Sequence, residues 1–249
     1  MQRFIKSIAA FMLIVTAMFV VGCTKPEDLN NEVDNGGNGE VVDDHVYVDL
    51  GLPSGLLWAT CNVGANAPEE YGDYFSWGET QPKDIYDWPN YRYFSGSDNS
   101  LLFTKYCSES YWGYNGFVDS LTVLEPSDDV ATVNWGADWR MPTKEECREL
   151  YLNTTVIGDT TLNDVAGVFF IAGNGNSIFL PTASYHWCDE FCDQEVYGYN
   201  GYYWTRTLGI ESPEGWALCL YSDGSSYHFY MDQFGRYAGF SVRPVTSGR

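Results

Sequence analysis

The stretch WRMPTKEECRELYL, residues 139–152, gives the clearest local indication of the fold. Thr143 stands where a helix N-cap is expected and Glu146 follows three positions later, so each side chain can accept the other's free backbone N–H in a capping box. Cys147, Leu150 and Tyr151 then share one helical face. The pattern predicts a short structural helix from residue 144, with Lys144, Glu145 and Arg148 on its outer face.

Sequence on both sides of this helix alternates between apolar and polar residues, which is typical of half-buried strands. VYVDL (46–50) has this pattern, and WALCLY (216–221) with YHFYM (227–231) forms two such runs around the turn SDGSS. VFFIAGNGNSIFL (168–180) places a Gly-Asn turn between two apolar runs, a strong hairpin signal. We therefore predict an α+β fold with irregular antiparallel sheets, few helices and long loops.

The N-terminus has the features of a secretory signal peptide. Arg3 and Lys6 precede an apolar run from Ile8 to Val21, and its roughly fourteen residues are fewer than the ~20 that a membrane-spanning helix needs. VVGC (20–23) resembles the bacterial lipobox, in which the cysteine is acylated and becomes the new N-terminus. We interpret 1–22 as a lipoprotein signal peptide and Cys23 as a lipidated, palmitate-carrying residue; an uncleaved anchor helix or an ordinary signal peptide is the alternative.

Residues 23–45 are acidic and contain the flexible run DNGGNG (34–39). They read as a tether, and the lysine and acids just after Cys23 resemble a signal for the outer face of the bacterial outer membrane. The whole chain carries a formal net charge of −21. Such a charge repels phosphates and anionic lipid heads, so we expect no nucleic-acid partner; it is compatible with calcium, with cationic partners or simply with solubility.

Five blocks between residues 46 and 246 then identify a family resemblance. VDLGLPSGLLWATCNVGA (48–65), EEYGDYFSWGET (69–80), VNWGADWRMPTKEECREL (133–150), GYYWTRT (201–207) and GFSVRPV (239–245) resemble, in this order, the Fibrobacter succinogenes major paralogous domain. The resemblance implies one exported domain over 46–246 with a C-type-lectin-like fold, related to formylglycine-generating enzymes. In that fold the first and last strands pair, here VYVDL with GFSVRPV.

Calcium-dependent lectins use Glu-Pro-Asn or Gln-Pro-Asp followed by Trp-Asn-Asp. The segment EPSDDVATVNWGADW (125–139) departs from both motifs at a ligand position. The alternative to a calcium site is that these acidic side chains are solvated and cap a turn. The weak candidate ligands are Glu125, Asp128, Asp129, Asn134 and Asp138.

Apart from Cys23 the cysteines are even in number, which in an exported protein permits disulfides without fixing their connectivity. A domain of this length can form a core without disulfides, so free buried thiols are the alternative. Cys188 and Cys192, near His186, have side chains that can bind zinc, but the sequence has no second Cys or His pair at the spacing of a zinc site. Formylglycine-generating enzymes need two active cysteines late in the domain, and this pair precedes GYYWTRT, so we expect no enzyme. The disulfide candidates are Cys61, Cys107, Cys147, Cys188, Cys192 and Cys219.

Aromatic residues gather in two loop-like stretches, DIYDWPNYRYFSG (84–96) and ESYWGYNG (109–116). Aromatic faces stack on sugar rings and anchor protein interfaces, although they also fill irregular cores. The candidate ligand contacts are Trp88, Tyr91, Tyr93, Tyr111, Trp112 and Tyr114.

These observations favour a lipid-anchored, surface-exposed binding module that recognises a glycan or a protein through loops between Tyr86 and Asp138. A structural subunit of an envelope complex or surface appendage is the first alternative, and a formylglycine-generating-like oxidase is the second. The expected fold does not identify a ligand, because one fold can serve many functions.

Overall fold

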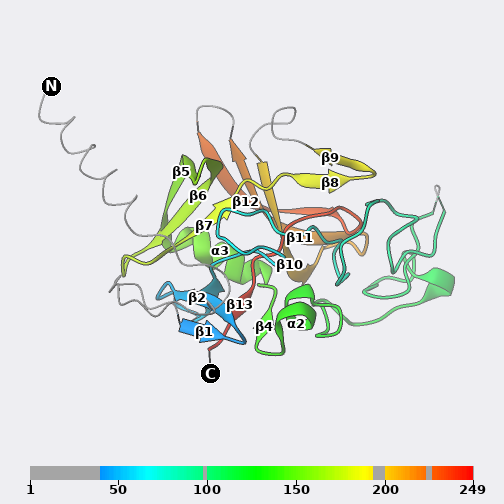
Figure 1. Cartoon of the computed structure of the whole chain (residues 1–249). Helices are drawn as coiled ribbons and strands as arrows, with labels where there is room; N and C mark the ends of the chain where they lie inside the picture. Colours follow the sequence, from blue (N-terminus) through cyan, green and yellow to red (C-terminus); the bar gives the residue numbers. More distant parts are fainter. Residues whose placement is uncertain (1–39, 98–99, 193–199, 223–225, 249) are drawn as a thin grey trace, which may run out of the picture.

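The computed structural model describes residues 40–97, 100–192, 200–222 and 226–248. Within these residues the named strands pair only in antiparallel fashion, and there are two α-helices. This confirms a sheet-rich fold with little helix (Figure 1).

A five-stranded sheet collects strands from the start, middle and end of the domain. Its spatial order is β1 (Glu40–Val42), β2 (His45–Asp49), β3 (Leu57–Ala59), β13 (Val245–Thr246) and β4 (Trp139–Arg140). The predicted direct pairing of VYVDL with GFSVRPV is wrong, because β3 lies between β2 and β13. Trp58 of β3 stands opposite Val48 on one side and Val245 on the other. Pro244, which has no N–H to donate, precedes the short β13 and limits its length.

The folded domain also begins earlier than the predicted tether boundary at residue 45. β1 pairs with β2, and the indole Nε1 of Trp139 donates to the Val42 carbonyl oxygen at 3.1 Å. His45 stacks on Trp135 with ring centroids 3.7 Å apart. Residues from Glu40 onward therefore belong to the domain.

Two three-stranded sheets and one hairpin complete the strands. The first consists of β5 (Thr154–Leu162), β6 (Val165–Ala172) and β7 (Ser177–Pro181); the second consists of β10 (Asn200–Leu208), β11 (Glu214–Ser222) and β12 (Tyr227–Gly235). β8 (Tyr185–Trp187) and β9 (Glu190–Cys192) form the hairpin. The β6–β7 and β11–β12 pairings confirm the two hairpins predicted from alternation.

The predicted helix is α3 (Lys144–Leu152), and its capping box is formed. The Glu146 N–H donates to Thr143 Oγ1 at 3.2 Å, and the Thr143 N–H donates to Glu146 Oε2 at 2.8 Å. Cys147 and Leu150 are buried, and α3 packs against β5, β10, β11 and β12. A shorter helix, α2 (Val130–Trp135), precedes β4, and a 3-10 turn, η1, spans Tyr114–Gly116.

Large aromatic side chains fill the core on both sides of these sheets. Trp77 and Trp204 each donate an indole N–H to a backbone carbonyl oxygen, of Thr205 and Phe75 respectively, both at 2.8 Å. Five tryptophans of this core are at most 7 % exposed, namely Trp58, Trp77, Trp135, Trp139 and Trp204.

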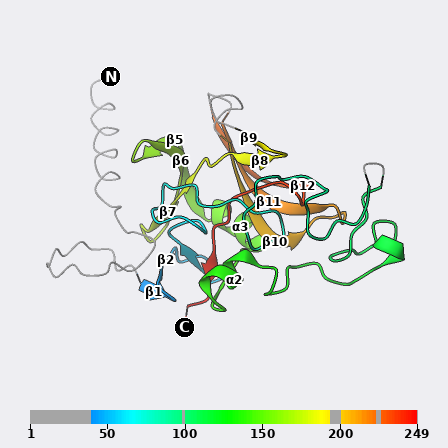
Figure 2. The same cartoon turned by 45° about the vertical axis from the view of Figure 1, so that its right-hand side comes forward.

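The segment between β3 and α2 has no named strand and projects away from the sheets, on the right in Figure 1 and again in Figure 2. It carries all six aromatic candidates for binding. Over the described ranges, the helices are all too short or too polar to cross a bilayer.

Candidate functional site

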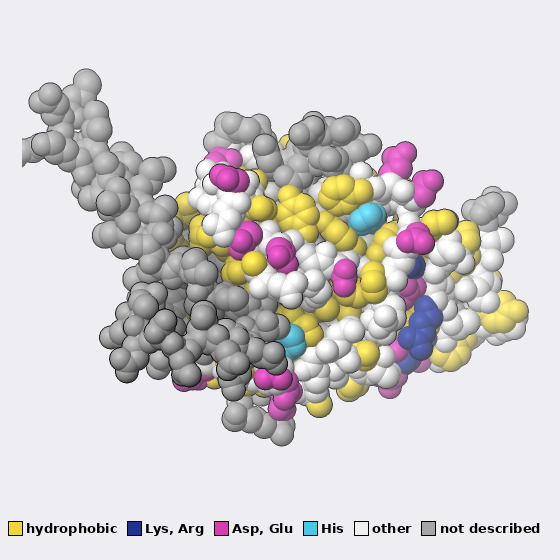
Figure 3. All heavy atoms as spheres, viewed as in Figure 1, with side chains coloured by type: hydrophobic (Ala, Val, Ile, Leu, Met, Phe, Trp, Pro, Cys, Tyr) yellow, Lys and Arg dark blue, Asp and Glu magenta, His cyan; other side chains and the backbone are white. Residues whose placement is uncertain are grey.

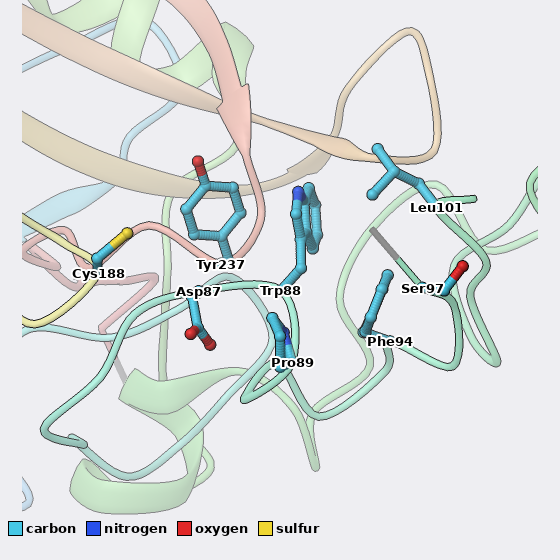
Figure 4. A pocket seen from close by; sticks show the side chains of 8 residues that line it. All are labelled: Asp87, Trp88, Pro89, Phe94, Ser97, Leu101, Cys188 and Tyr237. Atoms are coloured by element: carbon cyan, nitrogen blue, oxygen red, sulfur yellow. The ribbon is translucent and has the colours of Figure 1, made fainter. Parts of the chain in front are cut away.

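A pocket of about 260 Å³ opens where this projecting segment meets the tip of the β8–β9 hairpin. Figure 4 shows its lining: Trp88 and Tyr237 stand side by side, with Phe94 and Leu101 beyond Trp88 and Cys188 beyond Tyr237. The remaining lining residues are Asp87, Pro89 and Ser97. Its walls thus come from three segments that are far apart in the sequence.

Backbone hydrogen bonds attach the hairpin tip to the loop that carries Trp88. The Tyr86 N–H donates to the Cys188 carbonyl oxygen at 2.7 Å, and the Cys188 N–H donates back to the Tyr86 carbonyl oxygen at 2.9 Å. Cys188 has a φ of 56°, a left-handed conformation that allows the two-residue turn between β8 and β9. The loop itself is closed by Asp87, whose Oδ1 accepts the Asn90 N–H at 2.9 Å.

Aromatic contacts hold the pocket wall in place. The Trp88 ring lies 4.6 Å from that of Tyr237 and 5.8 Å from that of Phe94, centroid to centroid. On the other side of Tyr237, the half-exposed Trp187 lies 5.0 Å away. Burial raises the pKa of Tyr237 to about 12, so the phenol is neutral at physiological pH.

A buried arginine supports this wall from within the core. Arg236 is 0 % exposed, and its guanidinium lies 4.2 Å from the Phe103 ring centroid. Its Nη1 donates to the carbonyl oxygens of Lys105 and Tyr106 at 3.3 and 3.2 Å. Burial lowers its pKa, and the electron-rich faces of the surrounding rings partly offset the cost of desolvating the charge. Arg236 therefore fixes the backbone next to Tyr237.

The structure separates the predicted aromatic contacts into buried and accessible groups. Tyr91 and Tyr93 are 2 % and 6 % exposed, so their assignment as ligand contacts is wrong; the Tyr91 hydroxyl donates to the Trp77 carbonyl oxygen at 2.8 Å. Trp88 lines the pocket. The remaining candidates do not line it: Tyr111 is 77 % exposed, Tyr114 is 44 % exposed, and Trp112 is partly buried.

Protein groups already contact the acidic side chains of the candidate calcium segment. Asp128 is buried and accepts from Lys105 Nζ and from the Tyr106 hydroxyl, each at 2.6 Å. Burial opposes its ionisation, but the hydrogen bonds from Lys105, Tyr106 and Tyr93, together with the positive charge of Lys105, outweigh that effect and lower its pKa. Glu125 forms a second ion pair with Lys105 at 2.5 Å.

Asp129 caps α2, since its Oδ1 accepts the N–H groups of Ala131 and Thr132. The Met141 N–H also donates to this carboxylate, at 3.0 Å, and burial raises its pKa. Asn134 donates to the Val130 and Thr80 carbonyl oxygens, while Asp138 is partly buried in the turn before β4. Across the described residues, no group of three or more His, Cys, Asp or Glu side chains is placed to hold a metal ion.

The cysteines show one disulfide-bonded residue, Cys61. The other disulfide candidates are free thiols, namely Cys107, Cys147, Cys188, Cys192 and Cys219. Cys188 is exposed and the other four are buried, because Cys188 lies in the hairpin turn while the others point into packed regions. Cys188 and Cys192 are thus not equivalent, as one is open to solvent and the other is not.

Among the aromatic residues that line the pocket, Tyr237 lies outside the stretches that the sequence singled out. It lies in the turn directly after β12, where nothing in the local pattern distinguishes a pocket residue from a core residue. Trp88 was identified because it lies in an aromatic loop, whereas Tyr237 joins it only through tertiary packing.

Comparison with protein-family models, with curated proteins and with solved structures found no match. The resemblance to the major paralogous domain, and the C-type-lectin-like fold it implies, therefore stay predictions from the sequence blocks.

Proposed function

We propose that this chain is a non-enzymatic, lipid-anchored binding module of the bacterial outer membrane that recognises a glycan or a protein at the cell surface. The observation that carries the proposal is the aromatic pocket formed by Trp88, Phe94 and Tyr237 at the junction of the projecting segment and the β8–β9 hairpin. Concave, largely apolar sites with a few polar groups are the usual places for binding. A C-type-lectin-like fold, in which loops carry the binding residues, is part of the proposal.

The surface charge of the domain supports recognition of something other than a nucleic acid. Figure 3 shows acidic side chains scattered over one face of the domain and Lys and Arg gathered in a single area on the right. With a formal net charge of −21, the domain repels polyanions and attracts cationic or neutral partners.

Anchoring depends on Cys23, which lies outside the described residues. The folded domain begins by Glu40, so the acidic residues between Cys23 and Glu40 would separate the domain from the lipid. We infer that the pocket is presented away from the membrane on this acidic segment, with no calcium required.

Glycan arrays and peptide arrays probed with the purified chain test the proposal. Trp88→Ala should abolish any signal, because Trp88 forms the central wall of the pocket. Tyr111→Ala removes an exposed aromatic side chain outside the pocket and is the matched control. Binding that survives Trp88→Ala but disappears with Tyr111→Ala would move the site to the 111–118 segment.

One observation favours the alternative of a structural or assembly component. The segment around η1 exposes several large apolar side chains on a tightly turned backbone: Tyr111, Tyr114, Phe117 and Val118. Exposed apolar side chains that lie together mark interaction sites in soluble domains. Stable co-purification with an envelope protein that is lost with Tyr111→Asp, but kept with Trp88→Ala, would support this role.

A further inference from the structure

We propose that the pocket takes one large apolar side chain of a partner protein whose neighbouring residues are lysine or arginine. This inference rests on the proposed function and deepens it, because it selects protein over glycan as the ligand. The argument uses the polarity of the pocket lining, the size of the pocket and the charge around its mouth.

Polar groups are scarce in the pocket lining. Among the described lining residues, Asp87, Ser97 and Cys188 have polar side chains, Trp88 and Tyr237 add one indole N–H and one hydroxyl, and the rest is apolar. Asp87 Oδ1 is already occupied, since it accepts from both the N–H and the side-chain amide of Asn90, at 2.9 and 2.6 Å. A sugar ring carries several hydroxyl groups, and each one buried without a partner costs free energy. An apolar side chain avoids this cost.

The size of the pocket also suits a single side chain. Its volume of about 260 Å³ lies below the ~300–1,000 Å³ of most small-molecule pockets. Protein interfaces characteristically place one aromatic or aliphatic anchor in such a pocket and surround it with weaker contacts. Trp187, 46 % exposed and packed against Tyr237, extends the apolar surface beyond the mouth.

Negative charge surrounds the mouth of the pocket. Asp84 is exposed beside the loop, and Asp189 and Glu190 are exposed at the hairpin tip. The basic residues of this loop are paired with acids, Lys83 with Glu79 at 2.9 Å and Arg92 with Asp128 at 3.7 Å. No Lys or Arg is among the described residues that line the pocket. Complementary charge on a partner therefore means Lys or Arg next to the anchor, which accelerates encounter and favours the correct register.

The walls are fixed before any partner binds. Two backbone hydrogen bonds join Tyr86 to Cys188, and Arg236 holds the backbone beside Tyr237 through two carbonyl oxygens. A preformed pocket loses little conformational entropy on binding. A side chain entering from a partner thus meets a surface that is already complementary.

Cys188 provides a direct test, because its exposed thiol lines the pocket while the other free cysteines of the described chain are buried. The full chain, purified in detergent, is treated with iodoacetamide, and the alkylation rate of Cys188 is followed by peptide mass spectrometry. The probe is a short glycine peptide with a central Trp between two Lys. Control peptides replace the Trp by Ala or both Lys by Glu, and methyl glucoside and methyl N-acetylglucosaminide serve as sugar probes.

We expect the Trp–Lys peptide to slow alkylation of Cys188 at millimolar concentration. The Ala peptide should need a concentration at least about tenfold higher to give the same protection, because it lacks the side chain that anchors the peptide in the pocket. The Glu peptide should protect less than the Lys peptide at low salt, with the difference shrinking at high salt. Neither sugar should protect.

An occlusion experiment blocks the pocket at Cys188 and leaves Trp88 and Tyr237 unchanged. A bulky maleimide on Cys188 should prevent peptide binding, measured by fluorescence anisotropy, and the smaller methylthio adduct should weaken it less. The same maleimide treatment of Cys188→Ala should cause no further change in binding, because the reactive thiol of the pocket is gone. Peptide binding that tolerates the bulky adduct overturns the inference.

The outcomes separate this inference from the proposed function. Protection by a sugar and not by the peptide overturns the choice of a protein ligand but leaves a binding module in place. No protection by either probe class removes the pocket as a binding site, and both proposals then fail.

Discussion

Trp88 and Tyr237 lie with their rings 4.6 Å apart, although one comes from the projecting loop before α2 and the other from the chain after β12. Their contact joins the loop to the sheet β10-β11-β12 and forms the pocket wall. Binding and stability are therefore linked at this site, because the side chains that would meet a ligand also hold the loop in place.

Trp88→Ala should lower the free energy of unfolding by about 2–4 kcal/mol, because the indole packs against the rings of Tyr91, Phe94, Phe103 and Tyr237. Urea denaturation measures this difference. Tyr111→Ala, which removes a side chain that is 77 % exposed, should change stability by no more than about 0.5 kcal/mol. Equal effects of the two substitutions would show that Trp88 is not integrated in the packing.

Tyr237→Phe should make the domain less sensitive to alkaline pH. Burial raises the pKa of Tyr237 from 10.0 to about 12, so above pH 10 the unfolded chain releases this proton before the folded chain does. The contribution of Tyr237 to stability is thus present below pH 10 and is lost as the pH rises toward 12. Between pH 10 and 12, the free energy of unfolding of the variant should therefore fall by up to about 1.4 kcal/mol less per pH unit than that of the wild type. Denaturation at several pH values, with Tyr111→Phe as the matched exposed variant, measures the slope; identical slopes for wild type and Tyr237→Phe would contradict the prediction.

Arg236→Ala should cost about 3 kcal/mol or more, because it leaves a cavity and removes the donor for the carbonyl oxygens of Lys105 and Tyr106. Nε and Nη2 have no hydrogen-bond partner within the described part of the chain, so Arg236→Met, which keeps most of the volume and removes the buried charge, should cost less. Chemical denaturation of both variants tests the order. Arg148→Ala, at an exposed position, is the control. A larger loss of stability for Arg236→Met than for Arg236→Ala would show that the buried charge itself stabilises the domain, contrary to the prediction.

Thr143→Ala should destabilise the domain by about 1 kcal/mol, since it removes the acceptor of the Glu146 N–H at the start of α3. Thr143→Ser keeps the hydroxyl and should restore most of this loss. Thermal and urea unfolding of the two variants provide the comparison. If serine fails to rescue, the threonine methyl group and not the cap accounts for the effect.

Cys23→Ser should abolish incorporation of labelled palmitate and release the protein from the membrane fraction, because the lipid attaches to the sulfur of Cys23 in our proposal. Metabolic labelling followed by membrane fractionation measures both. Cys188→Ser, which removes a free and exposed thiol, is the control for loss of a cysteine elsewhere in the chain. Undiminished palmitate in the Cys23→Ser protein would remove the proposed anchor while leaving the binding pocket unaffected.

Part of this molecule could be predicted from the sequence because the relevant interactions are local. The capping box of α3 depends on Thr143 and Glu146, which are three positions apart. The β6–β7 hairpin depends on the Gly-Asn turn from Gly173 to Asn176 and on the apolar runs beside it. These features are set by backbone geometry within a few residues, so the pattern of residue types is enough to place them.

Tertiary structure alone decided which aromatic side chains are buried and where the pocket lies. Trp88 and Tyr91 are close together in one loop, yet Trp88 lines the pocket and Tyr91 is 2 % exposed. The insertion of β3 between β2 and β13 likewise depends on contacts between distant segments. Local sequence sets how much free energy a buried ring can contribute, but whether it is buried depends on which remote segments pack around it, and that information is spread over the whole chain.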